Sequence, residues 1–256
     1  MNMNRAIVLC ILSMITLSLA EERMSSCYST NMSPYRRMGQ KSSYFINSNT
    51  DTGEITYPGC EPVMLWYLGR HGARRPSAGE IVEMKVELPA LQTNILNASM
   101  HGYGQMCQED IDHLRNWTFK WTEEDHKLLM ESGVKEQMEL GESWGQRLPS
   151  LLDDSHRIQV RATYKQRTWA SAKSFLTGLY GHTVDFPQNI VPAMLLSFYE
   201  FCPAYMDGVD SNNNTFIEKY KLMAMQDYLD MVEAVSRRVG LEMSTADVEM
   251  AWAMCR

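Results

Sequence analysis

The stretch from Leu65 to Ser77 constrains this 256-residue chain more than any other. It reads Leu-Trp-Tyr-Leu-Gly-Arg-His-Gly-Ala-Arg-Arg-Pro-Ser. It begins as the end of an apolar run, 63–68, whose short length and aliphatic and aromatic residues predict a buried strand. Ser77 and Glu80 form a capping-box pattern, which predicts a helix directly after the turn. One histidine and two or three arginines therefore lie between a strand and a helix, where open α/β sheets bind their ligands.

The residue types in this turn are suited to phosphate. Guanidinium groups match phosphate oxygens in pairs and stay charged, and glycine lets the backbone approach a ligand closely. Arg70 and Arg74 are four residues apart around a turn, so both can converge on one anion. His71 between them is a candidate nucleophile. A basic surface turn with a structural histidine is the alternative, but five fixed residue types in one seven-residue frame arise by chance in roughly one chain in ten thousand of this length.

The segment Arg70 to Pro76 matches in full the signature Arg-His-Gly-x-Arg-x-Pro of the histidine phosphatase superfamily, in its histidine acid phosphatase branch. Within that branch the chain most resembles the multiple inositol polyphosphate phosphatases, and segments 41–44 and 166–172 share the resemblance. The resemblance implies an α/β fold, a phosphoglycerate-mutase-like three-layer sandwich with an inserted α-helical cap, of which only the N-terminal part is present. It implies hydrolysis of inositol polyphosphate phosphomonoesters through a phosphohistidine at His71, with no cofactor.

A second strand and helix are expected to complete the phosphate site. Residues 158–162 alternate apolar and polar side chains, which predicts a strand, and a helix is expected from near Thr168 to Gly181. Arg167 lies in the turn between them, and by the resemblance it joins the two signature arginines around the phosphate. Arg161 and Arg75 are further candidates, although a surface carboxylate is a serious rival partner for Arg161.

The proton donor for the leaving alkoxide is missing from the expected pattern. A general acid contributes about a hundredfold to ten-thousandfold, and in the family it comes from a His-Ala-Glu or His-Asp motif. No histidine of this chain is followed by Ala-Glu or by Asp. Glu80 and Glu83 are conceivable proton donors, but they are poorly placed, beyond the signature turn. Because residues 251–256 end in helical sequence, we expect a chain truncated before that motif. The alternative function is therefore a non-catalytic isoform that binds phosphorylated ligands or a partner without turnover.

Residues 1–20 are expected to form a cleaved signal peptide, because Arg5 precedes an apolar stretch and small residues end it. A retained signal anchor is the alternative, but the stretch is short for a membrane span. We therefore expect the chain in the endoplasmic reticulum lumen, at the cell surface or secreted, with no transmembrane span after cleavage. This compartment argues against a third reading, a glycolytic mutase of the same superfamily.

Sequons and cysteines agree with a secretory compartment. Four sequons predict glycosylation, at Asn31, Asn97, Asn116 and Asn213. Five cysteines lie beyond the signal, which predicts disulfides and at least one thiol without a partner in this chain: Cys27, Cys60, Cys107, Cys202 and Cys255. Neither a Cys-x-x-Cys pair nor a histidine cluster indicates a metal site.

Charge limits the class of partner. The formal net charge of −7 and the isoelectric point near 5.4 argue against nucleic acid, whose binding needs a basic surface. A phosphorylated small molecule remains compatible, because a local arginine cluster sets the potential in a cleft.

The resemblance implies two parts beyond the signal peptide. Residues 21–184 would form the N-terminal part of the α/β domain, and residues 185–256 would form part of the helical cap. Within the first, we expect a helix over 130–148 that covers a sheet face, and loops with short helices over 87–121. Residues 184–205 have no assignment. Within the cap, Thr215 and Glu218 form a capping-box pattern for a helix that ends at Gly240, and its apolar stripe needs a partner helix.

Overall fold

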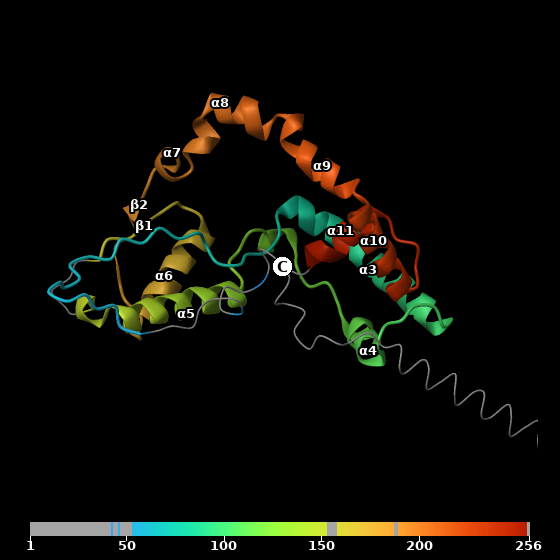
Figure 1. Cartoon of the computed structure of the whole chain (residues 1–256), viewed down its shortest axis with the longest axis horizontal. Coiled ribbons are helices and arrows are strands. Elements are labelled where there is room, and N and C mark those ends of the chain that lie inside the picture. The colour runs from blue at the N-terminus through green and yellow to red at the C-terminus, as the bar shows by residue number, and fades with distance from the viewer. Residues whose placement is uncertain (1–41, 43–45, 47–52, 153–157, 187–188, 255–256) are drawn as a thin grey trace, which may run out of the picture. The chain divides into compact units, whose positions relative to one another are not determined.

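The computed structural model describes residues 42, 46, 53–152, 158–186 and 189–254. These residues are mostly helical, as Figure 1 shows. They form two compact units, and the division falls inside the first described long helix. One unit holds the described residues of 34–82 and 121–218, including the signature, and the other holds 83–120 and 219–254. The signal peptide, Asn31, Cys27, Cys255 and most of segment 41–44 lie outside the described residues.

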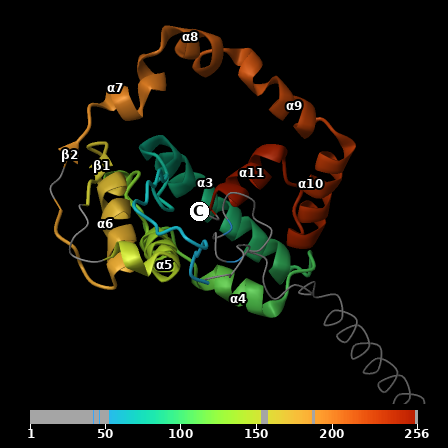
Figure 2. The ribbon, with the colours of Figure 1, turned by 60° about the vertical axis from the view of Figure 1, so that its left-hand side comes forward.

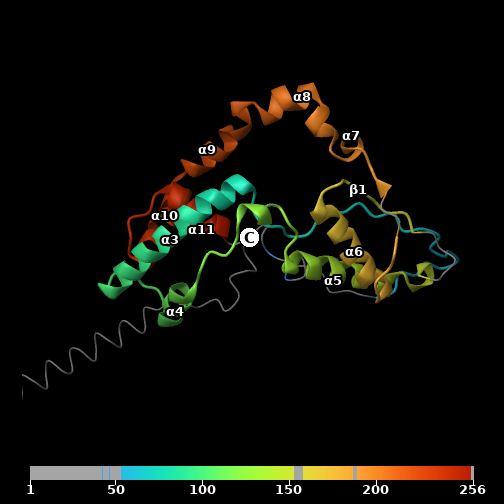
Figure 3. The ribbon, with the colours of Figure 1, turned by 180° about the vertical axis from the view of Figure 1, so that it is seen from behind.

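In the unit with the signature, helices α5 (Glu131–Arg147) and α6 (Gln166–Tyr180) lie side by side (Figures 1 and 3). A Cβ added at Gly141 would collide with the carbonyl of Phe175, and one at Gly178 with the carbonyl of Met138. Glycine therefore lets the two backbones meet. Both helices are confirmed as predicted. The packed neighbour of α5 is the helix α6, and its covering of a sheet face stays a prediction.

The predicted strand over 63–68 is not formed. This run has no regular secondary structure, and Val63 and Trp66 are 83% and 75% exposed. A strand needs a neighbour that satisfies its backbone groups. In the described part of the chain the sheet consists of two short parallel strands, β1 (Arg161–Ala162) and β2 (Asn189–Ile190), which do not include this run. The three-layer sandwich therefore stays a prediction, and the strand expected over 158–162 is confirmed only at its last two residues.

Helix α3 (Ala78–Met100) begins as predicted and runs further than predicted. Ser77 and Glu80 form the expected capping box: the Ser77 backbone N–H and hydroxyl each donate to Glu80 Oε2 at 2.7 Å. The loops expected from position 87 are wrong up to Met100, because the helix continues through Pro89. Apolar residues that recur at helical spacing on both sides of the proline are buried, Ile81, Met84, Leu88, Ile95 and Ala98. Their burial offsets the hydrogen bond that proline cannot make.

The predicted helix over 215–239 is divided. It consists of a 3₁₀ turn η7 (Asn213–Phe216), helix α9 (Ile217–Met223) and helix α10 (Gln226–Val239), with Met225 in an extended conformation between the helices. The expected capping box is wrong at Thr215, whose hydroxyl donates to the Val209 carbonyl at 2.5 Å. The predicted end at Gly240 is confirmed, since this glycine has a φ of 75° and caps α10.

The apolar stripe of α10 has the partner helix that its sequence requires. Val232 is buried with Met243 and with Val248 of helix α11 (Thr245–Met254), and Leu91 of α3 packs on this cluster. Figure 2 shows α10 and α11 near α3. Helix α4 (Gln108–Asn116) belongs to the same unit and buries Ile111. These contacts form the core of the second unit.

The segment without a prediction, 184–205, contains short elements. After β2 come α7 (Ala193–Leu196), η5 (Phe198–Phe201) and α8 (Pro203–Tyr205), followed by a π-helical turn η6 (Met206–Asp210). Two further 3₁₀ turns, η3 (Glu123–Asp125) and η4 (Pro149–Leu151), flank α5. In the part of the chain that the structure describes, every helix is too short or too polar to cross a membrane.

Candidate active site

The signature turn is held by an antiparallel partner segment instead of a sheet. The backbone N–H of Arg75 donates to Leu128 at 2.8 Å, and that of Met130 donates to Ala73 at 2.9 Å. The Leu129 N–H donates to Oε1 of Gln166, the first residue of α6, at 3.1 Å. The segment just before α5 therefore connects the signature to the start of α6.

Gly72 lies at the centre of this arrangement and is buried. Its N–H donates to Oγ of Ser171, on α6, at 3.0 Å. A Cβ at Gly72 would come within 2.5 Å of the carbonyl oxygen of Gly133, in the first turn of α5. Only a residue without a side chain fits between these two helices at this point.

His71 is half-buried, and its ring has a defined orientation. Nδ1 lies 2.8 Å from the carbonyl oxygen of Gly72. A carbonyl can only accept, so Nδ1 carries the proton of this hydrogen bond. In the neutral ring, Nε2 then holds the free lone pair.

The surroundings of His71 favour its neutral form. Burial lowers its pKa most, and the nearby charges of Arg167, Arg70 and Arg74 lower it further, while the hydrogen bond to Gly72 raises it. A positive charge close to a histidine disfavours the second proton. The structure thus brings these three arginines near one imidazole whose pKa they lower. That combination suits an anionic substrate and a nitrogen nucleophile.

Each arginine of this cluster comes from a different local setting. Arg70 ends the exposed run, and its carbonyl is 3.5 Å from Nε2 of the buried Gln137 on α5. Arg74 is half-buried, and its Nη1 donates to the Arg75 carbonyl at 2.8 Å. Arg167 lies in the first turn of α6, and its Nε is buried with no hydrogen-bond partner among the described residues. This Nε is a donor available to a bound anion.

Two predicted candidates lie outside the cluster. Arg75 pairs with Asp125, whose pKa is lowered first by the backbone N–H of Thr122 and also by this arginine. Arg161 is exposed on β1 and is not among the cations that shift the pKa of His71. The side chain of Arg75 therefore has a structural partner, and that of Arg161 faces solvent.

Glu80 is engaged in the cap of α3. Its Oε2 accepts two hydrogen bonds from Ser77. This role argues against Glu80 as the proton donor. Glu83 is exposed on the same helix.

Sequence reasoning did not single out Ser171, Gln137 or Gly133, although spacing could have found them. Ser171 follows Arg167 by four residues, so both lie on one face of α6. Gly133 and Gln137 have the same spacing on α5. One face of α5 and one face of α6, each marked by two residues four positions apart, therefore meet the signature turn.

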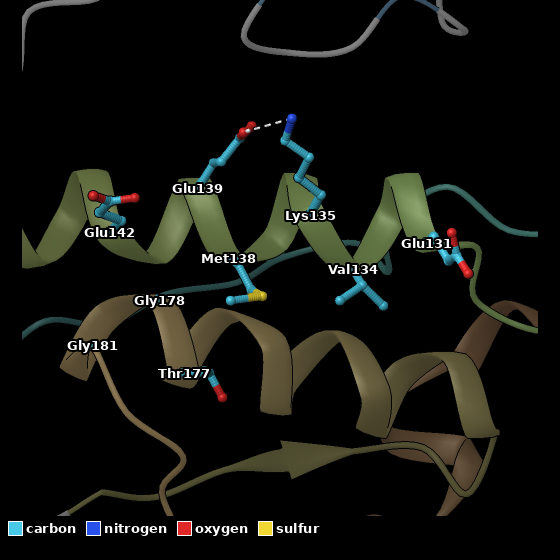
Figure 4. A pocket seen from close by; sticks show the side chains of 9 residues that line it. All are labelled: Glu131, Val134, Lys135, Met138, Glu139, Glu142, Thr177, Gly178 and Gly181. Carbon is cyan, nitrogen blue, oxygen red and sulfur yellow. Dashed lines mark ion pairs between the residues drawn. The ribbon is translucent and has the colours of Figure 1, made fainter.

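A groove of about 620 Å³ lies between α5 and α6 and is not this site (Figure 4). Its lining includes Glu131, Glu139 and Glu142, and its one cation, Lys135, is 3.6 Å from Glu139. Carboxylates repel phosphate, so the groove does not suit the predicted substrate. In the described residues, no group of three or more histidine, cysteine, aspartate or glutamate side chains could hold a metal ion.

Comparisons with known proteins identify the family. The profile of the histidine phosphatase superfamily (branch 2) matches residues 63–255. Multiple inositol polyphosphate phosphatase 1 of Drosophila melanogaster is 25% identical over 98% of this chain and 56% of its own length. The Homo sapiens protein of that name is 23% identical over 77% of the chain and 43% of its own length. Phytase A of Penicillium oxalicum is 30% identical over 56% of the chain and 28% of its own length.

The chain thus spans about half the length of the first two relatives. No solved structure matches it. The family match includes the whole signature turn, the partner segment and both helices that contact it. On this evidence the chain belongs to the histidine phosphatase superfamily, branch 2.

Proposed function

We propose that this chain carries the nucleophile and phosphate pocket of a phosphatase that hydrolyses inositol polyphosphates. The observation that carries the proposal is the His71 ring, fixed through Nδ1 and close enough to Arg70, Arg74 and Arg167 for their charges to lower its pKa. The relatives reported above, two inositol polyphosphate phosphatases and a phytase, support this substrate class.

The proposed reaction has two steps. Nε2 of His71 attacks phosphorus, the bond from phosphorus to the ester oxygen breaks with its electron pair on that oxygen, and the departing alkoxide takes a proton from solvent water. Water then attacks the phosphohistidine, which releases inorganic phosphate and restores the histidine. The three arginines stabilise the negative charge on the phosphoryl oxygens in both steps, which is the main contribution a protein makes to phosphoryl transfer.

A second candidate function is phosphate binding without efficient turnover. Two observations favour it: no histidine of the chain begins a His-Ala-Glu or His-Asp motif, and Glu80 is engaged in a helix cap. A site with a nucleophile and no general acid transfers phosphate only from a good leaving group.

Two substrates separate the candidates. Nitrophenyl phosphate needs no proton donor, because nitrophenolate is stable as an anion, whereas inositol hexakisphosphate releases an alkoxide. The purified chain and His71→Ala are assayed for phosphate release from both. Release from both that disappears in the variant supports the hydrolase. Release from nitrophenyl phosphate alone supports a pocket without its acid, and release that survives in His71→Ala contradicts the proposed nucleophile.

We also propose that the chain acts in the secretory pathway, as a glycoprotein. Three observations support this location: the sequence of residues 1–20, the disulfide-bonded state of Cys107, and the exposure of the sequon residues Asn97, Asn116 and Asn213. Cys60 and Cys202 are free thiols. Removal of N-linked glycans from the secreted chain should increase its electrophoretic mobility, and an unchanged mobility contradicts the assignment.

A further inference from the structure

We infer that Ser171 is a positioning residue for His71, acting through the backbone of Gly72. Its role in the reaction depends on the proposed function, but its effect on the imidazole can be measured without turnover. Ser171 contacts neither the ring nor the three arginines through any described hydrogen bond, so its action is indirect.

The contacts form a short chain from helix to ring. Ser171 Oγ accepts the N–H of Gly72 at 3.0 Å, and the carbonyl of Gly72 accepts Nδ1 of His71 at 2.8 Å. The N–H and the carbonyl of Gly72 belong to successive peptide groups that meet at its Cα, and glycine restrains rotation about the two bonds of that Cα least. The hydroxyl of Ser171 restrains the residue whose carbonyl orients the imidazole.

Burial makes the hydrogen bond between the Gly72 N–H and Ser171 Oγ important for the turn. Ser171 is 5% exposed and the hydrogen bond from Gly72 is buried, so water does not replace a lost acceptor easily. Without the hydroxyl, the Gly72 N–H would be buried and unsatisfied, and the turn would adjust to satisfy it. The adjustment would weaken the hydrogen bond from His71, and the ring could then carry its proton on either nitrogen.

The position of Ser171 on α6 links this orientation to the phosphate pocket. Arg167 lies four residues earlier on the same face and is the arginine with the largest effect on the pKa of His71. One rigid helix therefore supplies both a phosphate-binding cation and the contact that positions the nucleophile.

The test compares Ser171→Ala with Ser171→Thr and with Ser174→Ala. Ser174 is the matched control: it is also buried on α6, at 8% exposed, and its hydroxyl donates to the carbonyl of Ala170, away from the signature turn. Ser171→Thr keeps the acceptor. Ser171→Cys keeps the volume with a weak acceptor, and replaces the alanine variant if that variant does not fold.

The first readout is the tautomer of His71, measured by ring ¹⁵N shifts and assigned by the signal lost in His71→Ala. We expect the proton on Nδ1 in the wild-type chain, in Ser171→Thr and in Ser174→Ala, and a mixture in Ser171→Ala. The second readout is turnover of nitrophenyl phosphate. Loss of one hydrogen bond of ordinary strength predicts a kcat about tenfold lower in Ser171→Ala, with KM little changed.

The outcomes separate this inference from the proposed function. An inactive wild-type chain whose His71 tautomer still depends on Ser171 contradicts the hydrolase and supports the positioning role. An active wild-type chain whose tautomer and kcat are the same in Ser171→Ala overturns the positioning role and leaves the hydrolase intact. Equal effects of Ser171→Ala and Ser174→Ala also overturn it, because they indicate a general loss of packing.

Discussion

The backbone of Gly72 in the signature turn lies directly against the backbone of Gly133 in the first turn of α5. A Cβ on either residue would collide with the backbone at the other: that of Gly72 would lie 2.5 Å from the Gly133 carbonyl oxygen, and that of Gly133 would overlap the Ala73 carbonyl. This contact sets how closely α5 approaches the residue that follows His71. The position of the proposed nucleophile therefore depends on a glycine more than sixty residues away.

Gly133→Ala should displace the signature turn. Overpacking of this kind costs about 1–3 kcal/mol of stability, and phosphate affinity should fall with it. Thermal unfolding and phosphate binding by calorimetry measure both effects. Gly79→Ala is the control, because a Cβ there meets nothing within 4 Å and the residue lies in a helix. A Gly133→Ala variant as stable and as phosphate-binding as Gly79→Ala would contradict the close contact.

Arg167→Gln should raise the pKa of His71 and weaken phosphate binding. The pKa rises because a positive charge that disfavours protonation is removed. The acid limb of any pH–rate profile should move to higher pH, since more of the nucleophile is then protonated at a given acidic pH. Loss of a charged hydrogen-bond donor predicts an affinity about tenfold lower or more.

Arg161→Gln is the matched control for that experiment. This arginine precedes Arg167 by six residues, carries the same charge and is exposed on β1. We expect less than about a twofold change in phosphate affinity, as for surface charges in general. Equal losses in the two variants would place Arg161 in the pocket and contradict the arrangement described above.

Asp125→Asn should make stability less dependent on pH in the acidic range. The pKa of Asp125 is lowered by the Thr122 N–H and hydroxyl and by Arg75, so its ionised form stabilises the folded chain. That contribution is present above the ordinary pKa of an aspartate, about 3.9, and is lost as pH falls below it. Urea unfolding at several pH values should show a flatter acid decline in the variant. An unchanged decline would show that other carboxyl groups control it.

Trp66 should be the tryptophan most accessible to acrylamide. It is 75% exposed, whereas Trp252 is 43% exposed and the other tryptophans are less so. Trp66→Phe should remove the most strongly quenched part of the fluorescence, and Trp144→Phe, on α5, should not. Protection of Trp66 from the quencher would indicate that run 63–68 is covered, as in the strand that the sequence predicted.

Local signals in the sequence predicted much of the structure. The capping box of Ser77 and Glu80, the glycine ends of α6 and α10, and the extents of α5 and α6 all depend on residues close in the chain. The family signature also predicts His71, Arg70 and Arg74 as site residues, because seven contiguous residues contain that pattern.

The errors concern partners distant in the chain. Run 63–68 has the composition of a buried strand, but composition cannot supply the neighbour that a strand needs. Loops are expected from position 87, but the buried residues on both sides of Pro89 keep the helix intact to Met100. Spacing of four places Ser171 with Arg167 and Gly133 with Gln137, but the contacts of Ser171 and Gly133 with Gly72 depend on the packing of α5 and α6, which the sequence does not contain.

The measurement that tests the central claim most directly is the capture of phosphate on His71. The chain is mixed with labelled nitrophenyl phosphate, quenched in alkali, where phosphohistidine survives, and digested for peptide mapping. The account predicts label on the peptide that contains Arg70 to Pro76, absent in His71→Ala and released by acid. Label on another peptide, or a labelled chain in the His71→Ala variant, would contradict His71 as the nucleophile of this family member.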